Sequence, residues 1–307
     1  MTTRDILVVA HAHRADTVAA AARVVTALLA AGARPVLPGD DEALVHALTG
    51  VGDFAVLGTD AQIDTIELAV VLGGDGTILR AAEIVRESSA PVLGINMGHV
   101  GFLAEAEADD IDDAIRRVID RDYDVEERMA LSVRVKDTSG EVIYETWALN
   151  EATVEKASRE RMMEVVIEID GRPLSTFGCD GMVVATPTGS TAYNFSAGGP
   201  VIWPSVEAIA VVPLSAHALF ARPLVVGPEA AVAIEVLART YGTGILWCDG
   251  RRSHELPPGA RVVVRRSARP VRLARLHPAP FTDRLVRKFR LPVTGWRGPA
   301  GTVLEAE

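Results

Sequence analysis

The first part of the chain alternates short apolar runs with longer amphipathic stretches. The apolar runs have the length of buried strands and lie at residues 5–11, 34–37, 68–72 and 91–96. The amphipathic stretches have the spacing of helices and lie at residues 17–31, 41–48 and 78–85. Strands that alternate with helices predict βαβ units around a parallel sheet, where ligands bind at the carboxyl ends of the strands.

The pattern changes after about residue 122. Runs of alternating apolar and polar residues follow at 131–135, 165–170, 231–236 and 261–265. Gly, Pro and Asp interrupt these runs at short intervals, which is typical of antiparallel β structure with one buried face. The pair Asp170 and Gly171 suits a hairpin turn.

We therefore predict an α/β protein with two domains. Residues 1–122 are expected to form a Rossmann-like parallel α/β domain, and residues 123–277 a mostly antiparallel β domain. The 307 residues are enough for two modest cores. Hydrophobic residues make up 49% and charged residues 23%, which is an ordinary globular balance.

A glycine-rich turn follows the apolar run at 68–72. Its sequence is Gly73, Gly74, Asp75, Gly76 and Thr77. Glycines can adopt backbone angles that other residues avoid, and they lack the Cβ atoms that would hold a ligand away. The amides of the turn and of the next helix can then point at a phosphate.

Asp75 is the unusual member of this turn, because a carboxylate repels phosphate unless it binds a metal ion or accepts a proton. The combination indicates phosphoryl transfer to a hydroxyl. The turn is neither the G-x-G-x-x-G dinucleotide motif nor a P-loop, since no Lys-Ser or Lys-Thr pair follows the glycines. A tight turn without a ligand is the alternative for this motif taken alone.

A second motif carries a cluster of small hydroxyl groups. The short apolar run 182–185 leads into Thr186, Thr188, Gly189, Ser190 and Thr191. Such short side chains suit the oxygens of ribose and phosphate, and the ring of Tyr193 can pack on a base or a nicotinamide. A Ser- and Thr-rich turn without a ligand is again the alternative.

Together the two motifs resemble those of the NAD kinase family. The matching segments are residues 73–77, 150–151, 180–181, 186–193, 196–200, 213–217 and 220–224, and they keep their order from about residue 68 to residue 250. The glycine–aspartate turn alone is shared with lipid kinases and phosphofructokinases. The threonine-rich motif and the Asn150–Glu151 pair narrow the choice.

The resemblance implies a set of site residues. It places the phosphates of the donor on the amides of Gly73, Gly74, Gly76 and Thr77, with Asp75 as the catalytic residue. It places NAD against Asn150, Glu151, Gly178, Asp180, Thr191, Ala192, Tyr193, Asn194, Phe195 and Ser196. Arg80 and Arg161 are candidates for contacts with an anion, and each is equally well explained as a solvated arginine.

The implied reaction moves a phosphoryl group from ATP or polyphosphate to the 2′-hydroxyl of the adenosine ribose of NAD. A divalent cation, Mg²⁺ or Mn²⁺, assists, and the sequence assigns no residue as its ligand. Asp75 either accepts the proton of the hydroxyl or orients the metal ion. The alternatives are a lipid or sphingoid-base kinase, for which residues 186–196 are too polar, and a non-enzymatic NAD sensor.

Charge and composition restrict the partners. The formal net charge of −10 disfavours nucleic acid as a partner. No apolar run reaches the ~18 residues of a membrane helix, the N-terminus lacks the features of a signal peptide, and the two cysteines are too few for a disulfide framework. We expect a cytoplasmic protein. The resemblance suggests a homo-oligomer, a dimer or a tetramer, whose tail at 278–307 returns to the first domain.

Overall fold

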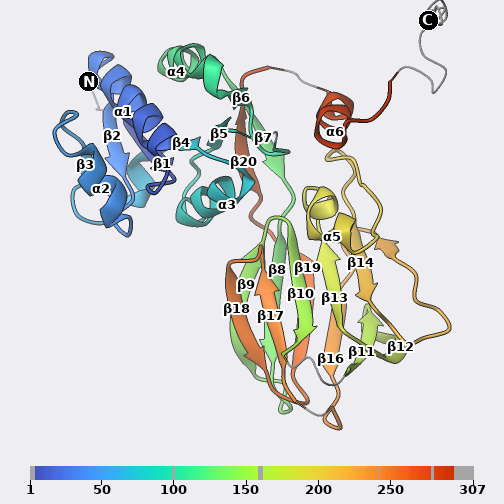
Figure 1. The fold of residues 1–307 in the computed structure, drawn as a ribbon. Coiled ribbons are helices and arrows are strands. Elements are labelled where there is room, and N and C mark those ends of the chain that lie inside the picture. Colours follow the sequence, from blue (N-terminus) through green and yellow to red (C-terminus); the bar gives the residue numbers. More distant parts are fainter. Residues whose placement is uncertain (1–3, 99–100, 158–161, 241, 278–279, 294–307) are drawn as a thin grey trace, which may run out of the picture. The chain divides into compact units, whose positions relative to one another are not determined.

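The computed structural model describes residues 4–98, 101–157, 162–240, 242–277 and 280–293. The chain divides into two compact units (Figure 1). The first contains the residues up to Glu126 and those from Arg272 on, and the second is Glu127–Val271. The first unit is therefore discontinuous in sequence, and the second is inserted into it.

The first unit is built on a mainly parallel sheet. Its strands are β1 (Asp5–Ala10), β2 (Arg34–Leu37), β3 (Ala55–Val56), β4 (Ile66–Leu72), β5 (Val92–Asn96), β6 (Ala106–Glu107), β7 (Asp124–Arg128) and β20 (Val271–Arg275). Their order is β3-β2-β1-β4-β5-β20-β7, with β6 on β5. The strands from β3 to β5 are parallel and have the arrangement of a Rossmann-like fold.

Helices cover both faces of this sheet because its strands are apolar on both sides. They are α1 (Ala15–Ala30), α2 (Glu42–Leu48), α3 (Asp75–Ile84) and α4 (Ile111–Asp120), and a further helix, α6 (Phe281–Phe289), follows β20 in the chain. Side chains of α1, α2 and α4 share one buried cluster with Leu93 and Ile95 of β5. Gly94 faces the opposite side, where Ile78 of α3 occupies the space that a Cβ would need.

The second unit consists of two antiparallel sheets of six strands. One has the order β15 (Leu224–Val226), β14 (Ile209–Leu214), β13 (Gly181–Ala185), β10 (Glu151–Lys156), β17 (Gly244–Cys248) and β18 (Arg252–Leu256). The other has the order β12 (Arg172–Cys179), β11 (Met163–Ile169), β16 (Val232–Val236), β19 (Arg261–Arg266), β8 (Leu131–Lys136) and β9 (Val142–Ala148). The short helix α5 (Tyr193–Ser196) follows β13.

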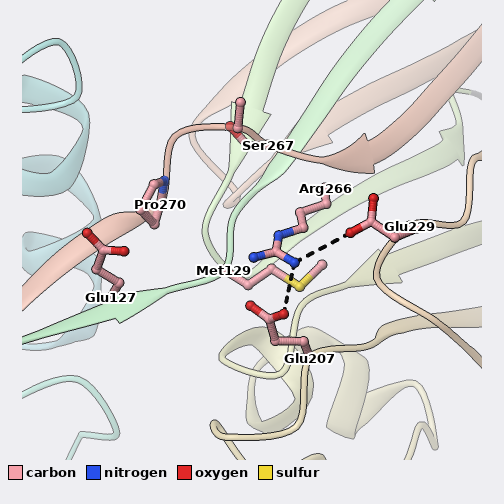
Figure 2. Close-up of a pocket in the computed structure, with 8 residues that line it drawn as sticks. Glu127, Met129, Glu207, Glu229, Arg266, Ser267 and Pro270 are labelled. Carbon is pink, nitrogen blue, oxygen red and sulfur yellow. Dashed lines mark hydrogen bonds and ion pairs between the residues drawn. The ribbon is translucent and has the colours of Figure 1, made fainter.

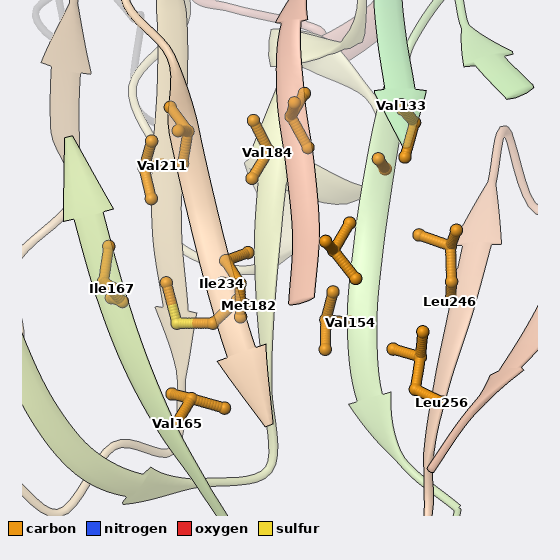
Figure 3. Close-up of a cluster of buried hydrophobic side chains, with 14 of the residues drawn as sticks. Val133, Val154, Val165, Ile167, Met182, Val184, Val211, Ile234, Leu246 and Leu256 are labelled. Carbon is orange, nitrogen blue, oxygen red and sulfur yellow. The ribbon is translucent and has the colours of Figure 1, made fainter. Parts of the chain in front are cut away.

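A single apolar core lies between these two sheets. Val154, Met182 and Leu246 come from the first sheet, and Val133, Val165 and Ile234 come from the second (Figure 3). All six side chains are buried. The alternation of apolar and polar residues along the strands thus places every second side chain in the core.

The fold class predicted from the sequence is confirmed: a parallel α/β sheet precedes antiparallel β structure. Asp170 and Gly171 form the turn between β11 and β12, and both have positive φ, as a type I′ hairpin turn requires. Helix α3 begins at Asp75, earlier than the expected residue 78, because Gly74 is already its N-cap. Among the described residues, no helix has the length and apolar character needed to cross a membrane.

Candidate active site

The glycine-rich turn joins β4 to α3 at the carboxyl end of the parallel sheet. The amide of Gly73 donates to the carbonyl of Ile95 on β5, 3.0 Å away. A Cβ on Gly73 would overlap the side chain of Thr77, so this position must be glycine for steric reasons. None of the turn's three glycines has a positive φ, so the expected use of unusual backbone angles is wrong here. Their value lies in the missing side chains.

Two backbone amides hold the Asp75 carboxylate. Phe102 donates to one oxygen and Leu103 to the other, and both N···O distances are 3.1 Å. A Cβ on Gly101 would overlap the same carboxylate. Asp75 is therefore fixed by a loop that lies 27 residues further along the chain, a partner that the sequence reading did not identify.

Free amide donors lie beside this carboxylate. The first amides of a helix have no acceptor within the helix, and no described residue accepts from the amides of Gly74, Asp75 or Gly76. Nothing lies within 4 Å of a Cβ added to Gly74 or Gly76. The turn can therefore bring an anion close to its backbone, where the positive end of the helix dipole favours it.

Arg80 lies on α3 and is paired within the protein. Its guanidinium contacts Asp41 at 2.7 Å and Asp40 at 3.2 Å. Asp41 also caps α2 by accepting a hydrogen bond from the amide of Leu44. Arg80 thus ties α3 to α2, and a contact with a bound anion stays a prediction.

Asn150 and Glu151 enter β10 in a buried corner of the second unit. Asp249, on the neighbouring turn after β17, accepts hydrogen bonds from the amides of Leu149 and Asn150 at 2.9 and 2.7 Å. Arg252 donates to Asp249 at 2.7 Å, and its guanidinium lies 4.4 Å from the ring centroid of Trp147. The Asp249–Arg252 pair was not among the predicted site residues.

The signal for Asp249 was present in the sequence. Cys-Asp-Gly occurs at 179–181 and again at 248–250, and the repeat is easily interpreted as coincidence or as two similar turns. The structure shows two different turns: Asp180 is half-buried between β12 and β13, whereas Asp249 is buried with a φ of +54°.

Burial changes the protonation of this corner. Burial, together with the charge of Asp249, raises the pKa of Glu151 to about 8, while the backbone amide of Tyr193 partly opposes the shift. Burial also raises the pKa of Asp249. The Oε2 atom of Glu151 has no hydrogen-bond partner among the described residues. At neutral pH Glu151 is therefore mainly protonated, with a free polar atom.

The threonine-rich segment packs directly against Asn150. The amide of Thr186 donates to the carbonyl of Asn150 at 2.9 Å, and Thr186 Oγ1 donates to the carbonyl of Leu149. A Cβ on Gly189 would overlap the Asn150 backbone. The two segments that the sequence analysis paired are therefore in contact through main-chain atoms.

The segment 191–196 has buried and exposed members. Asn194 is fully buried, and its Nδ2 donates to the carbonyls of Ser190 and Pro200 at 3.2 and 3.1 Å. Tyr193 and Phe195 are exposed on the short helix α5. Asn194 supports the loop, while Tyr193 and Phe195 are partly accessible to solvent.

Asp180 lies at the other end of β13. It is paired with Lys156 at 2.5 Å, and this interaction lowers the pKa of Asp180. The carbonyl of Gly178 accepts from the amide of His217 at 2.8 Å. Lys156 was not foreseen from the sequence. Arg161 was predicted as a candidate anion contact, and it lies outside the described residues.

A separate cavity of about 470 Å³ lies in the second unit (Figure 2). Arg266 there is paired with Glu207 at 2.8 Å and Glu229 at 3.6 Å. None of the residues lining the cavity belongs to the predicted site. The predicted site residues lie in the two motif regions and not around this cavity.

Family comparisons identify the chain along nearly its whole length. The family model of the ATP-NAD kinase N-terminal domain matches residues 6–123, and that of the ATP-NAD kinase C-terminal domain matches residues 149–276. The chain belongs to the NAD kinase family. It is therefore an enzyme of the kinase class.

Two similar curated proteins are named NAD kinases. The NAD kinase of Leifsonia xyli subsp. xyli is 64% identical over 299 residues, which cover 97% of this chain and 98% of the relative. The NAD kinase of Thermobifida fusca is 58% identical and is covered to 93%, with 97% of this chain aligned.

Solved structures of NAD kinases share the fold. Yeast NADH kinase complexed with NADH gives a TM-score of 0.85 at 22% identity, covering 95% of this chain and 89% of that one. An NAD kinase from Archaeoglobus fulgidus in complex with ATP gives 0.71 at 24% identity, covering 94% and 99%. At these identities the likeness concerns the fold alone.

Proposed function

We propose that this NAD kinase family member transfers the terminal phosphoryl group of ATP to the 2′-hydroxyl of the adenosine ribose of NAD. The names of its relatives and the ATP and NADH ligands of the two solved structures support this proposal. The observation that carries it is the position of Asp75, whose carboxylate is fixed by two amides beside a row of free backbone donors.

In the proposed step, Asp75 accepts the proton of the 2′-hydroxyl. The hydroxyl oxygen forms a bond to the γ-phosphorus of ATP, and the bond to the β–γ bridging oxygen breaks, so that ADP leaves and NADP forms. The free amides of Gly74, Asp75 and Gly76 would bind phosphate oxygens of ATP. General-base action of this kind accelerates a reaction by roughly 10²–10⁴-fold.

The second unit would hold NAD. The exposed ring of Tyr193 offers a stacking surface for a base, and Asp180 would accept from an amide or a ribose hydroxyl. Glu151, protonated at neutral pH, can donate a hydrogen bond from its carboxyl group to a ribose oxygen. Gly178, Thr191, Ala192, Phe195 and Ser196 would complete this surface, and the buried Asn194 would support it from within the loop.

A divalent cation fits the first site only as a companion of ATP. The described residues contain no group of three acidic, histidine or cysteine side chains that could hold a metal ion. Asp75 supplies one carboxylate, and Mg²⁺ in such sites uses one or two carboxylates together with substrate phosphates and water. The cation would neutralise phosphate charge when bound.

We also propose that the protein is a cytoplasmic homo-oligomer. Both cysteines are free, and burial raises the pKa of each to about 12, which keeps them as unreactive thiols. Leu219, Phe220 and Trp203 are exposed apolar side chains that a subunit contact would cover. Light scattering of the purified protein should give the mass of a dimer or a tetramer, and a monomer would refute this part.

The activity is tested with purified protein, Mg²⁺, NAD and ATP. We expect NADP to form, and we expect Asp75→Asn to lose about 10²–10⁴-fold in kcat while NAD still binds. Polyphosphate is tested as the donor in parallel. If Asp75→Asn turns over at the wild-type rate, the proposed role of Asp75 is wrong, and if no donor supports turnover, the proposed reaction is wrong.

A further inference from the structure

The C-terminal helix α6 is bonded to the loop that holds Asp75. Arg284 on α6 donates from Nη1 to the carbonyl of Phe102 at 3.1 Å and to the carbonyl of Ala104 at 2.6 Å. Its Nη2 contacts the Glu105 carboxylate at 2.7 Å. Three bonds from one planar guanidinium fix both its own plane and the backbone of the loop.

The ionic partner of Arg284 is a buried carboxylate. The Glu105 side chain is 1% exposed, and it is shared between Arg284 and Arg275 of β20. Arg275 contacts Glu105 at 2.7 Å and Glu126 at 2.6 Å. Because a buried carboxylate is costly without partners, this network holds the loop firmly in one place.

Aromatic packing attaches α6 to the same loop. The ring of Phe102 lies between two rings of α6, with centroid distances of 6.0 Å to Phe281 and 5.8 Å to Phe289. These separations are within the range of favourable aromatic pairs. The helix therefore contacts Phe102 through both its side chain and its carbonyl.

Arg284 and Asp75 bind opposite sides of one peptide unit. The carbonyl of Phe102 and the amide of Leu103 belong to the same planar group, and they point in opposite directions. Arg284 holds the carbonyl, and Asp75 receives the amide hydrogen bond. A change in the orientation of this peptide at Arg284 must therefore change the donor direction at Asp75. Polarisation of the carbonyl by the guanidinium also strengthens the amide as a donor.

We propose that Arg284 is a positioning residue for the Asp75 carboxylate, acting through the Phe102–Leu103 peptide. The proposal rests on the proposed role of Asp75 as the base. Arg284 need not touch either substrate. Its loss should lower the rate of the chemical step and leave the binding of ATP and NAD unchanged.

The test compares Arg284→Met with Arg287→Met in the full chain. Arg287 lies on the same helix, is largely exposed, and contacts Glu107 only at 3.9 Å. We expect Arg284→Met to lower kcat by about 10- to 100-fold, counted per NAD-binding site, with both KM values within about twofold of wild type. Arg287→Met should leave kcat and KM unchanged.

A purely structural role would instead lower the fraction of protein that binds NAD and spare kcat per binding site. Unchanged kcat per site in Arg284→Met, or a change confined to KM, would overturn the proposal. If Arg284→Met does not fold, Arg284→Lys tests the proposal instead, because lysine keeps the positive charge but lacks the planar set of guanidinium donors. We expect it to bind NAD fully and to lose at least about threefold in kcat, and wild-type kcat would refute the role.

The two proposals fail separately. If Asp75→Asn abolishes turnover and Arg284→Met does not reduce it, Asp75 acts without help from α6. If Asp75→Asn keeps full turnover, the role of Asp75 fails first, whatever Arg284 does.

Discussion

At the scale of single residues, the unusual feature is a pair of buried carboxyl groups. Glu151 and Asp249 both lie in the interior of the β unit, where ionisation is unfavourable. Asp249 is compensated by two amides and by Arg252. Glu151 receives one amide, from Tyr193, and keeps its proton instead. The environment thus compensates the carboxyl group of Asp249 and leaves that of Glu151 mainly protonated at neutral pH.

The protonation of Glu151 predicts how stability depends on pH. Its pKa is raised from 4.5 in the unfolded chain to about 8 in the fold. Between these values the native state holds a proton that the unfolded state lacks, so stability falls as pH rises, by up to about 1.4 kcal/mol per pH unit from this group. The Glu151→Gln variant cannot ionise at this position, so its stability should not fall with rising pH for this reason.

Urea unfolding of wild type and Glu151→Gln at pH 5 and pH 8 measures the effect. The urea concentration at the unfolding midpoint should be higher for Glu151→Gln than for wild type at pH 8, and it should not be higher at pH 5. An equal difference between the two proteins at both pH values would show that Glu151 is ionised in the fold.

At the scale of elements, the sequence reveals strands and helices better than the contacts between them. The apolar run of β4 and the glycines after it are adjacent in sequence, so the strand–turn–helix unit was predictable. The amides that hold Asp75 come from residues 102 and 103, which belong to no regular element and carry no motif. Periodicity contains no information on such a pairing.

The anchoring of α4 shows the same limit. Arg4, before β1, donates to the carbonyls of Val118 and Ile119 at the end of α4, and it forms a bidentate pair with Glu67 of β4. Arg121 contacts Glu67 as well, at 2.9 Å. Hydrogen bonds from Arg4, followed by Arg121, lower the pKa of Glu67 to about 2 against the effect of burial.

Glu67→Gln should therefore destabilise the protein in a pH-dependent way. Glu67 is ionised in the native state down to about pH 2, while the unfolded chain takes up a proton near 4.5. Its contribution is complete above about pH 4.5 and is lost as the pH falls toward 2. Because Arg121 is exposed and solvent screens the pair, we expect a loss of on the order of 1 kcal/mol at pH 7.

The measurement is the gap in unfolding midpoint between wild type and Glu67→Gln at pH 7 and pH 3. The gap should narrow at pH 3. If the midpoints differ by the same amount at both pH values, Glu67→Gln destabilises the protein through lost packing and not through the lost charge.

At the scale of the whole molecule, the main core of each unit is its own. The cluster around β1 and α1 contains residues of the first unit, and the cluster between the two six-stranded sheets contains residues of the second. The change from helical spacing to strand alternation predicted this difference in architecture. That β20 pairs in parallel with β5, across some 180 residues of sequence, was not predictable from local pattern.

A substitution that creates a cavity in the core of one unit tests whether the two units are stabilised independently. Ile234 is fully buried between the two sheets of the second unit. Ile234→Ala should cost about 2–5 kcal/mol. Hydrogen exchange should show reduced protection in the strands of that unit, with β1 and β4 as the internal reference. An equal loss of protection in β1 and β4 would contradict the separation of the cores.

Helix α6 is also the last described element of the chain. During translation the Asp75 turn is synthesised about two hundred residues before Arg284, the residue that we propose positions the Asp75 carboxylate. We therefore expect a nascent chain to acquire catalytic competence only after α6 has been synthesised, when its inserted β unit has already been made. Timing during synthesis would thus follow from the order in which the parts of one site are encoded.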